Sequence, residues 1–184
     1  TVALLASGSL LAGASFASSS AFAAVSLDNN LYCGTPNSAA NDTDLTINSD
    51  TSSEMLSTSD IDLTIDGTTY TASNCYGAFS ATASAQGEED DLNAIWGGGY
   101  TLLAKSDDTS NTDGSPLNGV DFDVVADQTV AGDYTVTWTD SGTNLPFTID
   151  LAVLLNGGTS AAAYLLESVS ILTTPTTGTG SFTV

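Results

Sequence analysis

Carboxylates are the side chains with which this chain could do chemistry, and their oxygen atoms are ligands that suit Ca²⁺. The 184 residues include 22 Asp and Glu, one lysine and no histidine. An oxygen-rich stretch offers four candidate calcium ligands: Asp107, Asp108, Asn111 and Asp113. An EF-hand is rejected, because placing Gly114 at the sixth loop position leaves the first carboxylate and the final bidentate glutamate missing. We therefore expect any calcium here to bind in an irregular loop.

A second acidic stretch, GEEDD, places four carboxylates side by side at residues 88–91. Adjacent carboxylates repel one another unless a cation binds between them. The simpler interpretation, which we favour, is an exposed loop in which water weakens the repulsion.

The sequence lacks the residues that most catalytic mechanisms require. Lys105 is the only cationic side chain, so a Ser-His-Asp triad, a Cys-His pair and an arginine clamp for phosphate are all absent. Residues 96–100, WGGGY, lack the lysine of a phosphate-binding loop and predict a flexible turn. Paired carboxylates can hydrolyse a glycosidic bond, but burial must raise the pKa of one of them. We predict that the protein is not an enzyme and keep a glycosidase only as the last alternative.

The formal net charge of −21 restricts the partners. Nucleic acid and anionic lipid are repelled, because proteins bind both through Lys and Arg. The favoured interpretation is a solvated acidic coat, and the alternative is a surface that collects Ca²⁺.

Lys105 and two tryptophans complete the set of residues of interest. Lys105 is expected at a strand end beside Asp107 and Asp108, where a surface ion pair contributes about 0–1 kcal/mol. Its predicted role is structural. Trp96 precedes three glycines, where an exposed ring can stack on a sugar, whereas Trp138 alternates with polar residues and is expected in the core.

The first segment has the pattern of a secretory signal peptide. Residues 2–16 are uncharged and mostly apolar, and residues 21–23 form a small-x-small cleavage pattern. We expect residues 1–23 to be removed and residues 24–184 to form the mature domain. The alternative is a retained hydrophobic segment, as in pilins. Serine and glycine interrupt the apolar run, which argues against a stable membrane span.

Cys33 and Cys75 both fall in the predicted mature chain. In an exported protein, two cysteines predict one disulfide bond. A zinc site is not expected, because two thiols without histidine or CxxC spacing do not complete its ligand set.

Period-2 alternation predicts the strands of an all-β domain. Residues 60–67, DIDLTIDG, alternate acidic and apolar positions and end in an Asp-Gly turn. Similar alternation marks three further segments, at residues 100–105, 120–125 and 133–140. Residues 147–155 are more continuously apolar and predict a central strand covered on both faces. Residues 161–172 are ambiguous, and we favour a strand. Turn-rich stretches separate these segments, which predicts a single β-sandwich or jelly-roll domain.

Several short blocks carry a family resemblance. They are NCYGAFS (residues 74–80), WGGGYTLLAKSDD (96–108), FTIDLAVLLNGGTSAAAYLLES (147–168) and TGTGSFTV (177–184). In this order they resemble a group of bacterial exported proteins that carry the PEP-CTERM sorting signal of exosortase substrates. The resemblance implies export, sorting to the cell envelope or extracellular matrix, and a non-enzymatic domain. The Pro-Glu-Pro motif, apolar span and basic cluster of that signal do not occur before Val184, so we interpret the C-terminus as truncated.

The expected function is that of a secreted bacterial cell-surface or extracellular-matrix protein. Its expected partners are exopolysaccharide or other envelope proteins, and Ca²⁺ is the one candidate cofactor. Two alternatives stay open. One is a calcium-assisted carbohydrate-binding module, and the other is a fibre or pilus-like subunit that keeps its hydrophobic first segment.

Overall fold

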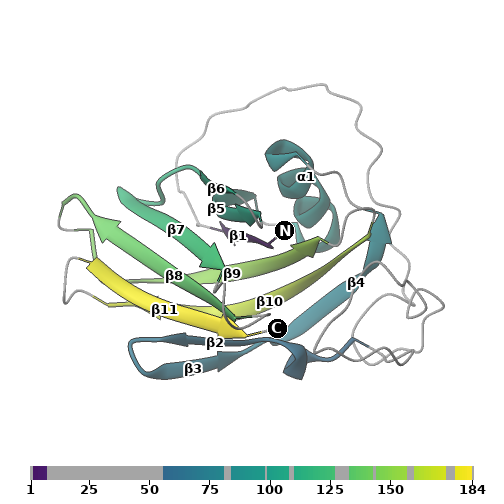
Figure 1. The fold of residues 1–184 in the computed structure, drawn as a ribbon, viewed down its shortest axis with the longest axis horizontal. Helices are drawn as coiled ribbons and strands as arrows, with labels where there is room; N and C mark the ends of the chain where they lie inside the picture. Colours follow the sequence, from purple (N-terminus) through teal and green to yellow (C-terminus); the bar gives the residue numbers. More distant parts are fainter. Residues whose placement is uncertain are drawn as a thin grey trace.

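Two antiparallel sheets contain the strands of the described residues. The computed structural model describes residues 2–7, 56–80, 84–97, 99–107, 110–126, 133–142, 144–156, 160–172 and 177–183. Sheet A has the strand order β4-β10-β9-β1-β5-β6, and sheet B has the order β3-β2-β11-β8-β7 (Figure 1). The all-β class predicted from the sequence is confirmed. The finer assignment to a sandwich or jelly roll stays a prediction.

The bounds of the elements follow the chain. Sheet A contains β1 (Val2–Ser7), β4 (Asn74–Ser80), β5 (Tyr100–Asp107), β6 (Ser110–Asp113), β9 (Phe147–Asn156) and β10 (Ser160–Ile171). Sheet B contains β2 (Asp62–Ile65), β3 (Thr68–Thr71), β7 (Val120–Ala126), β8 (Asp133–Asp140) and β11 (Thr177–Thr183). A 3₁₀ helix, η3 (Thr58–Asp60), precedes β2, and the α-helix α1 (Ala85–Trp96) precedes β5.

Alternation in the sequence correctly predicts three strands of sheet B, namely β2, β7 and β8. In β7, Val120, Phe122 and Val124 are buried and Asp121 is exposed, as the period-2 pattern predicts. In β8, Trp138 is buried at 1% exposure. The Asp-Gly turn after β2 is also confirmed: residues 66 and 67 have φ of 48° and 77°, and positive φ at both central positions defines a tight type I′ hairpin.

A buried apolar cluster draws side chains from both sheets, and we call it the inter-sheet cluster. Leu63 and Trp138 enter it from sheet B, and Leu4, Val153 and Tyr164 enter it from sheet A. Each fully buried aliphatic side chain contributes about 1.5–3 kcal/mol relative to an exposed one. This cluster therefore joins the two sheets by burial of apolar surface.

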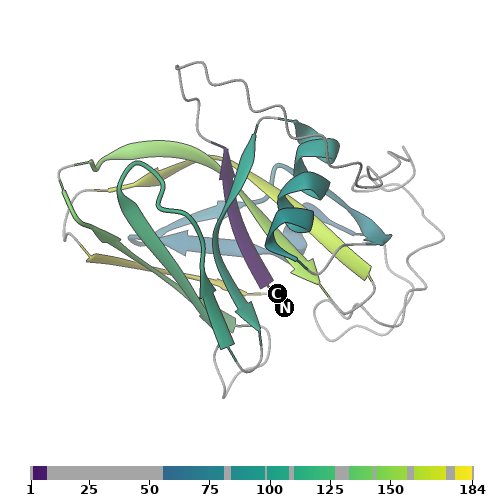
Figure 2. The ribbon, with the colours of Figure 1, turned by 90° about the horizontal axis from the view of Figure 1, so that it is seen from above.

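Helix α1 covers the opposite face of sheet A, as Figure 2 shows from above. Leu92 and Ile95 of the helix pack with Leu5, Leu102 and Leu154 of the sheet, and we call this set the helix-side cluster. Sheet A is thus apolar on both faces. That arrangement explains why β9 is buried at every position from residue 151 to residue 156, as predicted for a central strand.

The first segment lies inside sheet A. Strand β1 pairs antiparallel with β5 on one side and with β9 on the other. Ala3, Leu4 and Leu5 are at most 1% exposed. Cleavage after Ala23 would separate this strand from the rest of the chain. The cleaved signal peptide stays a prediction, and its structural consequence is now specific: β9 and β5 would lose their common partner.

Two polar contacts tie sheet A to the segments around β2 and β3. The Tyr164 hydroxyl donates to Asp60 Oδ2 at 3.0 Å, and Ser170 N donates to Tyr70 Oη at 3.2 Å. Burial raises the pKa of the Tyr164 hydroxyl, and the nearby Asp60 charge adds to this effect. The hydroxyl therefore stays protonated and remains a donor.

Asp140 organises the connection between β8 and β9. Its Oδ1 accepts from Gly142 N and from Asn144 Nδ2, both at 2.9 Å, and its Oδ2 accepts from Asn144 N at 3.0 Å. These hydrogen bonds, led by that from Gly142 N, lower the pKa of Asp140 below its ordinary value of 3.8. The ionised carboxylate therefore stabilises the loop at neutral pH, and this contribution is lost as the pH falls below 3.8.

We predict that Asp140→Asn lowers the melting temperature at pH 7, because one acceptor oxygen becomes an amide donor facing backbone N–H groups. The gap between the variant and the wild type narrows as the pH falls below 3.8, where wild-type Asp140 also loses its charge. Thermal melts between pH 7 and pH 3 measure the difference in melting temperature between the variant and the wild type. Asp62→Asn, at an exposed position of β2, is the control and has a small effect throughout. A gap that does not change with pH contradicts the prediction.

Candidate functional site

Helix α1 positions a group of polar contacts against β5. The Ser84 side chain caps its N-terminus by accepting from Gly87 N at 3.1 Å. Gly97 ends the helix with φ of 70°, a conformation that glycine adopts without strain. Leu92 and Ile95 turn the helix toward sheet A. The GEEDD stretch therefore lies within a helix, and the exposed loop that we expected is wrong.

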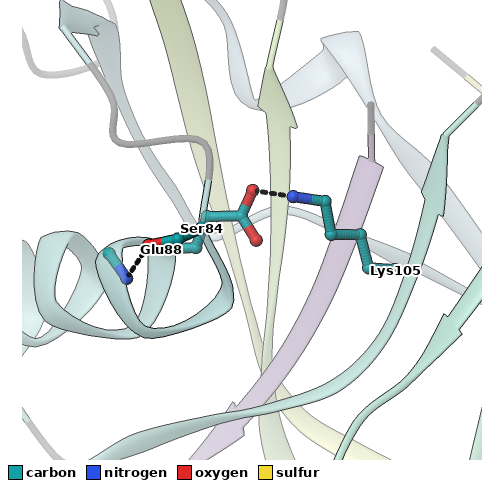
Figure 3. A network of polar contacts seen from close by, with 4 residues as sticks. Ser84, Glu88 and Lys105 are labelled. Carbon is teal, nitrogen blue, oxygen red and sulfur yellow. Dashed lines mark hydrogen bonds and ion pairs between the residues drawn. The ribbon is translucent and has the colours of Figure 1, made fainter.

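Lys105 lies at the centre of this group. Its Nζ contacts Glu88 Oε1 at 2.7 Å, as Figure 3 shows. The Lys105 side chain is 11% exposed and that of Glu88 is not exposed at all. The expected surface position of Lys105 is therefore wrong, whereas its expected pairing with Asp107 and Asp108, whose side chains lie outside the described part of the structure, stays a prediction. Lys105 is buried, and its partner is 17 residues earlier in the chain, in the first turn of α1.

A β-bulge explains why Lys105 points toward the helix. Strict alternation places Lys105 on the face opposite Tyr100 and Leu102. In the pairing of β1 with β5, however, Leu4 faces Ala104 and Leu5 faces Leu102, so Leu103 is one extra residue. The extra residue reverses the alternation. Ala104 enters the inter-sheet cluster, and Lys105 turns to α1.

Two further side chains of α1 accept hydrogen bonds from backbone N–H groups of β5, as a neighbouring strand would. Glu89 Oε1 accepts from Leu102 N at 2.8 Å, and Asn93 Oδ1 accepts from Tyr100 N at 2.6 Å. Four residues of helix span about 6 Å and two residues of strand span about 6.8 Å, so the two spacings match. Strand β6 pairs only with residues 104–107 of β5. The helix therefore satisfies backbone donors of β5 beyond the end of β6.

Three of the four candidate calcium ligands lie within the described residues. They belong to the hairpin of β5 and β6, so the irregular loop that we expected for them is wrong. Asp107 ends β5, and Asn111 and Asp113 belong to β6. In the register of this hairpin, Asn111 pairs with Ser106 and Asp113 pairs with Ala104. Asp108 lies outside the described residues. Among the residues that the structure describes, no cluster of three or more metal-ligating side chains is found, and calcium binding stays a prediction.

Two other predicted residues have distinct surroundings. Trp96, the last residue of α1, is partly buried against the helix-side cluster, with its ring 6.2 Å from that of Tyr100. It is therefore less available for sugar stacking than an exposed ring. Cys75 is completely buried in the inter-sheet cluster. Cys33 lies outside the described residues, so the Cys33–Cys75 disulfide stays a prediction.

A small hollow beside β7 and β8 brings together polar groups that the sequence did not single out. Its volume is about 150 Å³, and its lining consists of Gly114, Ser115, Pro116, Asp121, Phe122, Asp123, Thr137, Trp138 and Thr139. Carboxylate and hydroxyl groups of this kind can bind sugar hydroxyls or a cation. The indole nitrogen of Trp138 is buried and has no hydrogen-bond partner among the described atoms. Alternation on β7 and β8 predicts these outward carboxylates and hydroxyls, but nothing in the sequence places residues 114–116 beside them.

We predict that Lys105→Met lowers the free energy of unfolding by about 3–5 kcal/mol, because it leaves the buried carboxylate of Glu88 without its cation. The double variant Glu88→Leu/Lys105→Met recovers most of this loss, since an apolar pair can replace a buried ion pair. Urea denaturation measures both.

The control for this pair is Glu167→Gln, an exposed carboxylate on β10 that we expect to change stability by less than about 0.5 kcal/mol. If the double variant is as unstable as Lys105→Met, loss of packing rather than the uncompensated charge explains the effect.

Comparisons of the chain with protein-family models, with curated proteins and with solved structures found no match. No helix among the described residues is long and apolar enough to cross a membrane. The PEP-CTERM resemblance therefore stays a prediction, and the buried ion pair and the polar hollow are the features from which function is argued.

Proposed function

We propose that the protein is a non-enzymatic, secreted cell-surface or extracellular-matrix protein that associates with exopolysaccharide. The observation that carries the proposal is the burial of Lys105 against Glu88. Lys105 is the only Lys or Arg in the sequence, and there is no histidine. Every exposed ionisable side chain that carries charge at neutral pH is therefore acidic.

Such a surface has direct physical consequences. It repels phosphate backbones and anionic lipid, and it keeps copies of the protein apart at low ionic strength. Divalent cations screen it and can bridge it to other anionic material, including acidic polysaccharides. A hydrated, purely acidic exterior over a core buried on both faces of sheet A suits a durable component of a wet extracellular layer. The resemblance to PEP-CTERM proteins supports the same compartment.

The polar hollow is the best candidate for direct contact with a polysaccharide. Asp121 and Asp123 on β7 lie beside Thr137 and Thr139 on β8, and all four line it. Hydroxyl and carboxylate oxygens accept hydrogen bonds from sugar hydroxyls, and the carboxylates can also share a Ca²⁺ with the ligand. Trp96 is the alternative contact and is more buried than a stacking ring requires.

We predict that, in the source cells, fractionation recovers the protein with the surface or matrix material and that EDTA increases its release. The physical reason is that bridging by divalent cations holds acidic partners together. Immunoblots of the cytoplasmic, envelope and matrix fractions measure the distribution, and intact mass shows whether residues 1–23 are present. Recovery mainly from the cytoplasm contradicts the proposal.

We predict that the purified protein binds exopolysaccharide of the source cells in the presence of Ca²⁺ and that Asp121→Asn/Asp123→Asn weakens this binding at least tenfold. Sedimentation with the polysaccharide measures the bound fraction. Asp62→Asn/Asp66→Asn removes the same number of charges from the neighbourhood of β2 and is the matched control. If both double variants bind equally, net charge and not the hollow governs association. If both double variants bind as well as the wild type and EDTA has no effect, neither the hollow nor Ca²⁺ contributes to binding.

One observation favours the fibre-like alternative as the second candidate. The first segment provides a strand in the interior of sheet A, paired on both sides. A subunit that keeps this segment would use it as part of its fold. Detection of residues 1–23 in the mature protein by intact mass would favour this alternative over the cleaved form.

A further inference from the structure

Strand β1 is attached to the domain differently from its neighbours in sheet A. It lies between β9 and β5, which both pair with β1 and do not pair with each other. Its pairing with β9 runs without interruption from Val2–Leu155 to Ser7–Asp150. Residues 8–55 separate it from the next described strand, β2, which belongs to sheet B. The strand thus completes sheet A, whereas the next described strand of the chain belongs to sheet B.

The space that β1 fills between β9 and β5, which we call the slot, is buried on both faces of the sheet. Leu4 enters the inter-sheet cluster, whereas Ala3 and Leu5 enter the helix-side cluster. All three are at most 1% exposed. An empty slot would expose apolar side chains on both faces and unpaired backbone groups along β9 and β5. The slot therefore favours an extended, apolar strand with small and aliphatic side chains.

A strand on a long connection can fill its own slot or that of another copy. The contacts are the same in both cases, so local concentration decides between the two arrangements. Short hairpins lack this freedom: β2 and β3 are joined only through Asp66 and Gly67 and must pair with each other. Residues 8–55 impose no such restriction by length.

We propose that the slot between β9 and β5 also accepts residues Val2–Ser7 of a second copy of this chain, so that copies are linked by strand exchange. The exchange rests on the second proposed candidate, in which the first segment is retained. Its product is a closed dimer when two copies exchange reciprocally and an open chain when each copy donates to the next. Main-chain pairing provides the affinity, and the two buried faces select the sequence of the strand.

The test uses full-length variants with one new cysteine each. Ala6 faces Thr101 in the pairing of β1 with β5. Ala6→Cys and Thr101→Cys chains are mixed at several concentrations, warmed below the melting temperature, cooled and oxidised. Non-reducing gels and peptide mass mapping identify a bond between positions 6 and 101 of different copies. The double variant Ala6→Cys/Thr101→Cys reports the same bond within one copy.

The matched control places the same chemistry where exchange is not expected. Thr64 faces Thr69 in the pairing of β2 with β3, and their hydroxyls are 3.2 Å apart. Thr64→Cys and Thr69→Cys chains are mixed under identical conditions. This mixture gives the background of random intermolecular oxidation.

Exchange predicts that the 6–101 dimer exceeds the control dimer and that its fraction rises about tenfold for a tenfold increase in concentration, while the dimer is a minor species. A 6–101 bond that forms in the double variant but never above background between copies overturns exchange and leaves the surface function standing. Failure of the bond both within and between copies shows that β1 does not occupy the slot, and it overturns the proposal as well.

Discussion

The ion pair between Glu88 and Lys105 is the interaction on which the remainder of sheet A depends. It joins the first turn of α1 to β5 across a distance of 2.7 Å, and both side chains are largely removed from water. The sheet can be apolar on both faces only if something covers its outer face, and α1 is that cover. A buried pair of charges is weak evidence for net stability. It is better evidence for orientation, since a charge pair in a dry site tolerates little displacement of either partner.

The helix also solves a problem that sheets commonly have at their edges. Exposed backbone donors on an edge strand invite pairing with other chains. Glu89 and Asn93, four residues apart on α1, accept from backbone donors two residues apart on β5. The same helix therefore covers a face and satisfies part of an edge. This double use gives two of its acidic residues a role: the carboxylates of Glu88 and Glu89 are directed at β5, whereas Asp90 accepts from Gln86 in an exposed contact within the helix.

The sequence predicted the strands well where a single rule governs them. Acidic and apolar residues alternate in β7 because one face meets the inter-sheet cluster and the other meets water. The apolar run in β9 reflects burial on both faces. The candidate site was predicted poorly, for two identifiable reasons. Four neighbouring carboxylates suggested a solvated loop, although Leu92, Ile95 and Trp96 have the spacing of a helical face.

The bulge at Leu103 is the second reason. A single extra residue reverses which face every later side chain of the strand occupies. No local pattern in residues 100–107 marks it, because Leu102 and Leu103 are both apolar and both buried. The face of Lys105 is therefore decided by the pairing of β1 with β5, a contact between segments about a hundred residues apart. The position of β1 could not be anticipated either, since an uncharged apolar start has the same composition in a leader and in an interior strand.

Burial of the only lysine has one consequence outside the fold itself. Trypsin-like proteases cut after Lys or Arg, and Lys105 is the one such residue in the sequence. It lies within β5, 9% exposed, with strands on both sides. A protease needs an extended, accessible segment around the bond that it cuts, so the folded chain presents no susceptible peptide bond to this class of enzyme. The arrangement that fixes the helix to the sheet thus also shields the one peptide bond of the sequence that trypsin-like proteases would cut.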